Sequence, residues 1–174
     1  IAALLLGSEL YVANAGDCRA VLCRGGHALP LSRDHTAALE SERARVQAAG
    51  GQVSWQHNSW RVGSSGLQVT RCIGDFDVKG RPGVSTGAGG GVVAEPEVTH
   101  ITLQGGADGA GGAEGADSVL VLATDGLWDT VTSQEAVGLI ADTVKARRLL
   151  EGVSALRHHL FSARLMHAFT CIHA

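Results

Sequence analysis

The feature that most constrains this chain is an apolar segment that ends in carboxylates, DSVLVLATDGLWD at residues 117–129. Five of the six residues from Val119 to Thr124 are apolar, and such a run predicts a β-strand that is buried on both faces. Asp125 follows the run directly, and Asp129 comes one tight turn later. Two carboxylates at the end of a buried strand predict either a turn or a site for a cation.

Length and composition narrow the class of protein. The 174 residues, 45% of them apolar, suffice for one globular domain or most of one. A formal net charge of -3 indicates no nucleic-acid surface, and no apolar run approaches the roughly 20 residues of a membrane-spanning helix. The four cysteines lack CxxC spacing, which predicts a reduced intracellular protein, cytoplasmic or nuclear. Because the chain opens with Ile1 rather than Met, we expect its N-terminus to be a truncation point.

The order of hydrophobic patterns in the first part of the chain predicts strands followed by a helix. Residues 2–31 alternate as in an antiparallel meander with glycine-containing turns. Residues 36–51 change to a helical period, in which charged residues separate the apolar ones. Either Asp34 or Thr36 can cap the start of this helix, and a Gly-Gly pair ends it.

The second part of the chain continues the α+β pattern. Two short strands are expected within residues 52–71, a Gly-rich loop over 72–91, and an edge strand from Val92 to Gln104 because of Pro96. A helix follows Thr132, and the spacing of Thr132 and Glu135 predicts a capping box. Many strands and few helices, without regular alternation, favour antiparallel sheets with helices outside.

Two segments fall outside this pattern. Residues 104–116 are rich in glycine and alanine, which predicts a flexible surface insertion. Residues 146–174 form a divergent tail whose composition is compatible with a helix, although its apolar residues occur on every face. The expected domain therefore covers residues 1–145.

Aspartate next to glycine recurs at three predicted strand ends, at Asp17, Asp75 and Asp125. For any one of them a simple turn is favoured by about three chances in four. Asp17 and Asp125 both follow apolar strands, so their carboxylates converge if those strands are neighbours in one sheet. Converging carboxylates repel one another unless a cation neutralises them. Oxygen ligands alone favour Mg²⁺ or Mn²⁺ over zinc, and Asp129 would reach the same site directly or through water.

Five blocks of the sequence resemble, in order, those of the metal-dependent Ser/Thr protein phosphatases, the type 2C or PPM family: LYVANAGDCRAVL, PLSRDHTAALESERARVQAAGGQV, VTRCIGDFDVK, VVAEPEV and VLATDGLWDTVTSQEAV. The resemblance implies an antiparallel β-sandwich flanked by helices, here incomplete at both ends. It implies Mg²⁺ or Mn²⁺ cofactors, two ions and up to three in the complete domain. The implied reaction is hydrolysis of phosphoserine or phosphothreonine in a phosphoprotein by a metal-activated water, without a covalent intermediate. A monomer is expected.

The resemblance also implies roles for individual aspartates. Asp125 matches the family's metal-ligating aspartate in its Asp-Gly motif. Asp129 matches the second aspartate of that motif, which holds a metal through water. Asp17 matches the aspartate of a third, more weakly held metal site.

Arg71, Gly74 and Asp75 match a block beside the family's flap loop, where structural support and substrate contacts are expected. Other blocks are missing from this chain: the early acidic pair, the DGHGG-like motif and the late Asp-Asn motif. No catalytic acid or residue that contacts the substrate phosphate is therefore identifiable.

Three interpretations follow from this combination of matches and gaps. The first is a protein serine/threonine phosphatase, with this chain a fragment of weak or no activity by itself. The second is a catalytically inactive pseudophosphatase or protein-interaction module. A third, poorer one is an acidic divalent-ion binder, which should prefer Ca²⁺ over Mg²⁺.

Overall fold

The computed structural model describes residues 1–64, 66–79, 90–105 and 116–143. Of the predicted insertion only residues 104, 105 and 116 lie within these ranges, and the predicted tail over 146–174 lies outside them. The chain divides into two compact units. The first comprises Ile1–Ala3, Val12–Cys18 and Ser32–Thr99; the second comprises Leu4–Tyr11, Arg19–Leu31 and the described residues from His100 onwards.

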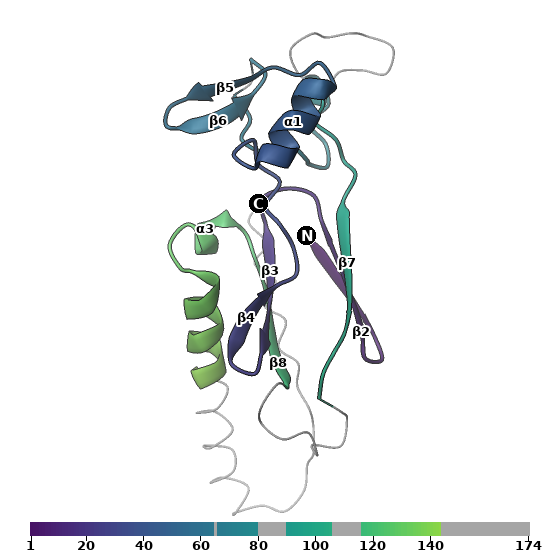
Figure 1. Cartoon of the computed structure of the whole chain (residues 1–174), viewed down its shortest axis with the longest axis vertical. Helices are drawn as coiled ribbons and strands as arrows, with labels where there is room; N and C mark the ends of the chain where they lie inside the picture. Colours follow the sequence, from purple (N-terminus) through teal and green to yellow (C-terminus); the bar gives the residue numbers. More distant parts are fainter. Residues whose placement is uncertain (65, 80–89, 106–115, 144–174) are drawn as a thin grey trace, which may run out of the picture. The chain divides into compact units, whose positions relative to one another are not determined.

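The described strands belong to three sheets (Figure 1). In spatial order, the first contains β1 (Ala2–Leu6), β2 (Glu9–Asn14) and β7 (Glu97–Thr102). The second contains β4 (His27–Pro30), β3 (Arg19–Arg24) and β8 (Asp117–Ala123). The third is a hairpin of β5 (Val53–Gln56) and β6 (Ser59–Val62). With the helices described below, these sheets confirm the predicted α+β class.

The meander predicted over residues 2–31 is wrong as a single sheet. The predicted strand pairs exist, but β1 and β2 belong to one sheet while β3 and β4 belong to another. The chain changes sheet between Asn14 and Arg19, where Gly16 has a φ of +134° that strongly favours glycine. The predicted turn at Gly25-Gly26 is present, because β3 and β4 form an antiparallel hairpin with Arg24 opposite His27.

The prediction that β8 is buried on both faces is also wrong. Val121 is its one buried residue, and β8 is the last described strand of its sheet, with β3 as its neighbour. Val119, Val121 and Ala123 pack into the core of the second unit, whereas Leu120 and Leu122 on the other face are half-buried. The apolar run therefore reflects one packed face and one partly covered face.

The helix predicted over residues 36–51 is α1, but it spans only Glu40–Ala48. Neither Asp34 nor Thr36 caps it, because the N-cap is Leu39, whose side chain makes no capping hydrogen bond. Two acidic residues in the first turn interact favourably with the helix dipole instead.

Two helical turns were not predicted. The segment expected to be a loop over 72–91 contains the short helix α2 (Phe76–Lys79), and residues 80–89 lie outside the described part of the chain. The short helix α3 (Asp125–Trp128) begins directly after β8 and Thr124. Carboxylate-bearing turns follow apolar strands here, as predicted, but the turn at Asp125 is helical.

The core of the second unit forms between the β4-β3-β8 sheet and a helix over residues 133–143, drawn in green in Figure 1. Its buried members are Val21, Cys23, Val121, Trp128, Ala136 and Val137. The capping box at the start of the helix is confirmed, because Thr132 N donates to Glu135 Oε2 at 2.9 Å and Glu135 N donates to Thr132 Oγ1 at 3.2 Å. Among the described residues, no helix is long and apolar enough to cross a membrane.

A buried apolar cluster of the first unit has a polar neighbour. Ala37, Val46, Val62 and Val92 are buried together, with Trp60 among the partly buried residues around them. Glu42 of α1 is also buried, with 4% of its surface exposed. A buried carboxylate in a helix needs hydrogen-bonding partners, and these partners connect α1 to the predicted flap segment.

Candidate functional site

The turn that carries Asp125 and Asp129 is a single helical turn at the end of β8. Asp129 N donates to Asp125 O at 2.8 Å, and Leu127 N donates to Thr124 O at 3.2 Å. Both aspartate side chains are exposed, and neither forms an ion pair with any residue that the structure describes. Their oxygens are therefore available as hard donors of the kind that Mg²⁺ and Mn²⁺ prefer.

Trp128 anchors this turn to the core of the second unit. Its exposed fraction is 8%, and its indole Nε1 donates to Ala123 O at 2.9 Å. The guanidinium of Arg19 lies 5.3 Å from the centre of the indole ring, and its Nη1 donates to Ser133 Oγ at 3.3 Å. The turn is thus held from below by a buried ring and flanked by a cation that links it to the next helix.

The turn that carries Asp17 is held differently, by polar contacts within the first unit. Asn14 is buried, and its Nδ2 donates to Gly16 O at 3.0 Å and to Arg33 O at 2.9 Å. His35 N donates to the same Gly16 carbonyl at 2.9 Å, while Gly16 N donates to His35 Nδ1 at 3.5 Å. Every polar backbone group of Gly16 is therefore hydrogen-bonded, which fixes the residue that precedes Asp17.

His35 is the buried end of a chain of polar contacts that reaches the surface at Arg33. Its Nε2 lies 3.1 Å from Glu97 Oε2, and Glu97 in turn accepts a hydrogen bond from Arg33 at 2.9 Å. The pKa of Glu97 lies below its ordinary value, chiefly because Arg33 donates to the carboxylate; burial acts in the opposite direction, and His35 adds to the lowering. No motif or spacing in the sequence indicated this role for His35.

The structure does not meet the condition under which Asp17 and Asp125 were expected to converge. Asp17 follows β2 and Asp125 follows β8, and these strands belong to different sheets. Asp17 also precedes β3, whose Arg19 pairs with Ala123 of β8. The two aspartates belong to different units. In the described ranges of the chain, no three His, Cys, Asp or Glu side chains are grouped to hold a metal ion.

The donor chemistry of the Asp125–Asp129 turn nevertheless fits a hydrated divalent cation. Its two carboxylates are exposed within one helical turn, and carboxylate oxygens are ligands that Mg²⁺ and Mn²⁺ prefer. This turn therefore suits either ion in type and would supply part of a ligand set. In the first unit, Asn14 has a buried Oδ1 atom without a hydrogen-bond partner among the described residues, a position that water commonly satisfies.

Arg71 is held by Glu42, the buried carboxylate of α1. Arg71 Nη2 donates to Glu42 Oε1 at 2.7 Å and Nε donates to Oε2 at 3.1 Å, while Nη1 donates to Glu95 O at 3.1 Å. The hydrogen bond to Glu42 raises the pKa of Arg71 above its already high ordinary value, against the opposing effect of burial. These contacts tie the segment around Arg71 to α1 and to the residues before β7.

Glu42 is the centre of this network. Besides Arg71 it accepts hydrogen bonds from Arg45 Nη2 at 2.7 Å and from Thr70 Oγ1 at 2.7 Å. Burial alone would raise the pKa of Glu42, but the hydrogen bonds from Arg71, Arg45 and Thr70 outweigh it, so the pKa lies well below its ordinary value. The sequence carried one signal of this burial, since Glu42 shares a helical face with Leu39 and Val46.

Gly74 and Asp75 lie at the start of α2. Both have positive φ angles, 89° at Gly74 and 50° at Asp75, and the Asp75 carbonyl accepts hydrogen bonds from Val78 N and Lys79 N at 3.0 Å each. The Asp75 side chain is exposed. In the structure this pair forms the bend that opens α2, beyond the segment held by Arg71.

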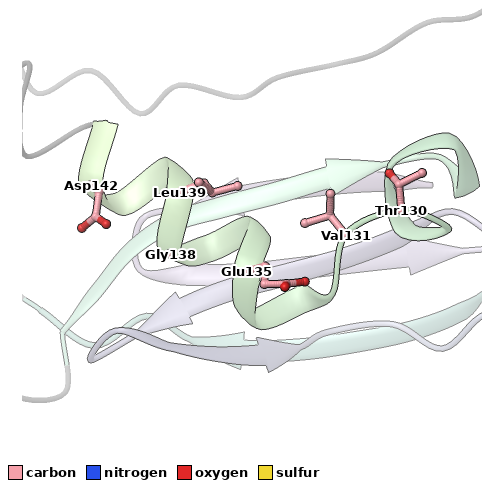
Figure 2. A pocket seen from close by; sticks show the side chains of 6 residues that line it. All are labelled: Thr130, Val131, Glu135, Gly138, Leu139 and Asp142. Carbon is pink, nitrogen blue, oxygen red and sulfur yellow. The ribbon is translucent and has the colours of Figure 1, made fainter.

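A shallow pocket of about 500 Å³ lies along the outer side of the 133–143 helix, next to the Asp125–Asp129 turn in sequence. Figure 2 shows its lining residues, which are Thr130, Val131, Glu135, Gly138, Leu139 and Asp142. Two of these side chains are acidic and none is basic, so the pocket repels a phosphate group. It does not fit the phosphorylated part of a substrate.

Comparison with known proteins agrees with the resemblance read from the motifs. A family model described as Protein phosphatase 2C matches residues 1–165. The chain belongs to this family.

Plant proteins are among the curated relatives of this phosphatase 2C chain. It is 46% identical over 145 residues to a "Protein kinase and PP2C-like domain-containing protein" of Arabidopsis thaliana, covering 83% of this chain and 19% of the relative. It is 42% identical over 138 residues to "Probable protein phosphatase 2C 59" of the same plant, covering 79% of this chain and 37% of the relative. The chain thus spans between about a fifth and two fifths of the length of these relatives.

Solved structures of phosphatase 2C type share the fold. A sex determining protein of C. elegans matches with a TM-score of 0.59 and 26% identity, covering 76% of this chain and 28% of that one. Serine-threonine phosphatase 2C from Toxoplasma gondii matches with a TM-score of 0.61 and 24% identity, covering 78% of this chain and 43% of that one. The second comparison bears on the fold alone, and in both the match covers less than half of the solved chain.

Proposed function

We propose that this chain is part of a Mg²⁺- or Mn²⁺-dependent protein phosphatase domain that hydrolyses phosphoserine and phosphothreonine. The observation that carries the proposal is the intact Asp125–Asp129 turn, in a chain of the phosphatase 2C family. Its carboxylates are exposed and make no ion pair with described residues, while Trp128 beneath them is buried. A rigid base below exposed carboxylates is what a metal site requires.

Asp125 would hold the catalytic metal ions directly, Asp129 would hold one through water, and Asp17 would serve a third, weaker site. When bound, the metal ions supply Lewis-acid activation of the attacking water and neutralise charge on the phosphoryl oxygens. Trp128 and Arg19 fix the direction of the Asp125–Asp129 turn through the contacts with Ala123 and Ser133. Such supporting contacts commonly change metal affinity 10- to 100-fold when they are removed.

Arg71 serves mainly to support the domain. The edge of its guanidinium formed by Nε and Nη2 is directed to Glu42, and Nη1 donates to the Glu95 carbonyl. That edge is therefore not free for bidentate binding of a phosphate. The remaining metal ligands and the main phosphate contacts would come from parts of the domain that this chain does not span, and the substrate would be a phosphoprotein.

A pseudophosphatase or protein-interaction module is the second candidate. The observation that favours it is that no three potential ligand side chains are grouped within the described residues. A chain of this kind would fold and show no turnover with any divalent ion.

Phosphate release from a phosphothreonine peptide tests the first candidate. We expect weak release in Mn²⁺ that EDTA abolishes and that Asp125→Asn removes. The matched control is Asp142→Asn, which changes an exposed aspartate of the same unit and should leave the rate unchanged. Release of this kind contradicts the interaction module, and equal release by the Asp125→Asn variant contradicts the role of Asp125. If a folded chain releases no phosphate, Mn²⁺ binding separates the candidates: binding that Asp125→Asn weakens supports an inactive piece of the phosphatase domain, and no binding favours the interaction module.

A further inference from the structure

His35 is a buried titratable side chain for which the proposed chemistry has no role. Its exposed fraction is 1%, and both ring nitrogens have partners, Gly16 N at Nδ1 and Glu97 Oε2 at Nε2. Burying an imidazole is costly unless its polar atoms are satisfied. Here they are satisfied by one backbone group of the Asp17 turn and one carboxylate of β7.

The partners determine which ring nitrogen carries the proton. A backbone N–H can only donate, so His35 Nδ1 accepts from Gly16 and carries no proton. Nε2 then carries the proton and donates it to Glu97 Oε2 at 3.1 Å. Glu97 therefore selects the tautomer in which the imidazole faces Gly16 with an acceptor.

The backbone of His35 is fixed as well. Its N–H donates to Gly16 O at 2.9 Å, and its carbonyl accepts from Thr70 N at 2.8 Å and from Thr70 Oγ1 at 3.0 Å. His35 thus links the Gly16 turn to the residue next to Arg71. Gly16 has the φ of +134° noted above, and its backbone is held by the hydrogen bonds with His35 and by the one from Asn14 to its carbonyl.

We propose that His35 is a positioning residue: its imidazole, held by Glu97, fixes the Gly16–Asp17 turn and so directs the Asp17 carboxylate. This inference rests on the proposed function, in which Asp17 is a metal ligand. It adds a residue that acts on Asp17 through the backbone and touches neither substrate nor metal.

Two substitutions separate the halves of the imidazole. His35→Asn retains an acceptor at the position of Nδ1 and loses the contact with Glu97. His35→Gln retains a donor that reaches Glu97 and loses the acceptor for Gly16. If His35 had only a structural role, variants with equal losses of stability should show equal changes in Gly16 exchange and in Mn²⁺ binding. The positioning role predicts that both changes are larger in the Gln variant.

The test uses the whole chain and two readouts. Hydrogen exchange at the Gly16 amide reports the turn itself, and titration with Mn²⁺ alone, followed by the electron paramagnetic resonance signal of free Mn²⁺, reports ion binding. His27→Gln, at an exposed histidine of β4, is the matched control. Glu97→Gln should also weaken the contact of His35 with Gly16. A glutamine can donate to His35 Nε2 and so select the tautomer that carries its proton on Nδ1, which cannot accept from Gly16 N.

In the His35→Gln variant we expect the rate of hydrogen exchange at the Gly16 amide to rise roughly fivefold, because one hydrogen bond is lost. The Mn²⁺ binding step that Asp17→Asn removes should weaken about tenfold. His35→Asn should change the exchange rate and the Mn²⁺ affinity by less, and His27→Gln should change neither.

Two results overturn the inference: wild-type exchange at Gly16 in a folded His35→Gln variant, or equal effects of the Asn and Gln variants. If Asp17→Asn leaves Mn²⁺ binding unchanged, the metal role of Asp17 fails. The exchange measurement still decides whether His35 positions the turn.

Discussion

The two turns that carry the candidate ligands are held by opposite kinds of interaction. The Asp17 turn depends on directional hydrogen bonds from the buried side chains of Asn14 and His35. The Asp125 turn depends mainly on the burial of Trp128 against the core of its unit. Removing one partner from a buried polar contact leaves another group unsatisfied, whereas an apolar contact weakens in proportion to the area lost. The polar turn should therefore be the more sensitive to single substitutions.

The same contrast extends to the units that contain the turns. The first unit has a charged centre at Glu42, which joins α1 to Thr70 and Arg71. The second has a continuous apolar core between a sheet and a helix, with an exposed capping box at the edge. The charged centre of the first unit and the apolar core of the second can be disrupted separately, by acid or by single substitutions.

The largest expected effect comes from Glu42→Gln. It leaves the guanidinium groups of Arg45 and Arg71 without their buried counter-ion, and breaking a buried pair from one side costs about 3–5 kcal/mol of unfolding free energy. The matched control is Glu40→Gln, on the same helix, whose carboxylate is 78% exposed and pairs with Arg43. Its cost should be less than about 1 kcal/mol. Urea unfolding of the three proteins measures both, and equal losses would contradict the role of Glu42.

Acid should weaken the same network. Because the pKa of Glu42 and that of Glu97 are lower in the folded chain, their contribution to stability is complete above the ordinary glutamate pKa of about 4.3. It is lost as the pH falls from there through the folded-state values. The Glu42→Gln variant should lose less stability than the wild type between pH 5 and pH 3, as followed by urea unfolding. A parallel decline of both proteins would show that Glu42 does not account for the acid sensitivity.

Trp128→Phe should have a smaller effect in the second unit. It keeps an aromatic ring in the core and removes the hydrogen bond to Ala123 O, at a cost of about 1–2 kcal/mol. Trp55→Phe is the control, because Trp55 is 58% exposed on β5 and should be nearly neutral. Thermal unfolding monitors both variants, and a larger loss at Trp55 would reverse the assignment of the core.

The smallest of these effects is expected for Thr132→Ala. It removes the hydroxyl that accepts from Glu135 N at the start of the 133–143 helix, a cap contact that typically contributes about 1 kcal/mol, while the backbone N–H of residue 132 can still donate to Glu135. Thr143→Ala, at an exposed position of the same helix, should change stability by less than about 0.5 kcal/mol. Hydrogen exchange of the first-turn amides provides a local measurement, and unchanged protection would mean that the cap is dispensable.

The parts of the fold that the sequence predicted are those set by neighbouring residues. The capping box of Thr132 and Glu135 is a spacing rule, and the Gly25-Gly26 turn brings together two strands that are adjacent in sequence. The sheet to which β3 belongs depends instead on its pairing with β8, nearly a hundred residues away. No local pattern reports such a pairing, so the single meander was a natural and wrong prediction.

The candidate site likewise has some features that the sequence predicted and others that it did not. The motif around Asp125 indicated a carboxylate turn at a strand end, and the structure has that turn; ligation of a metal by Asp125, Asp129 and Asp17 stays a prediction. The network of Glu42 with Arg71 and the contact of His35 with Gly16 were not predicted. These contacts join segments that are far apart in the sequence. A single charged or polar residue is normally expected to be exposed, so the local sequence did not indicate how these side chains are paired.

The central claim is that Asp125 is a metal ligand in a phosphatase 2C domain, and the most direct test is a titration of the purified chain with Mn²⁺. Electron paramagnetic resonance of free Mn²⁺ gives the bound fraction for the wild type, Asp125→Asn and the control Asp142→Asn. The account predicts binding by the wild type and by Asp142→Asn, and affinity at least tenfold weaker in Asp125→Asn, as expected when a charged ligand is lost. Equal binding by all three folded proteins would contradict it.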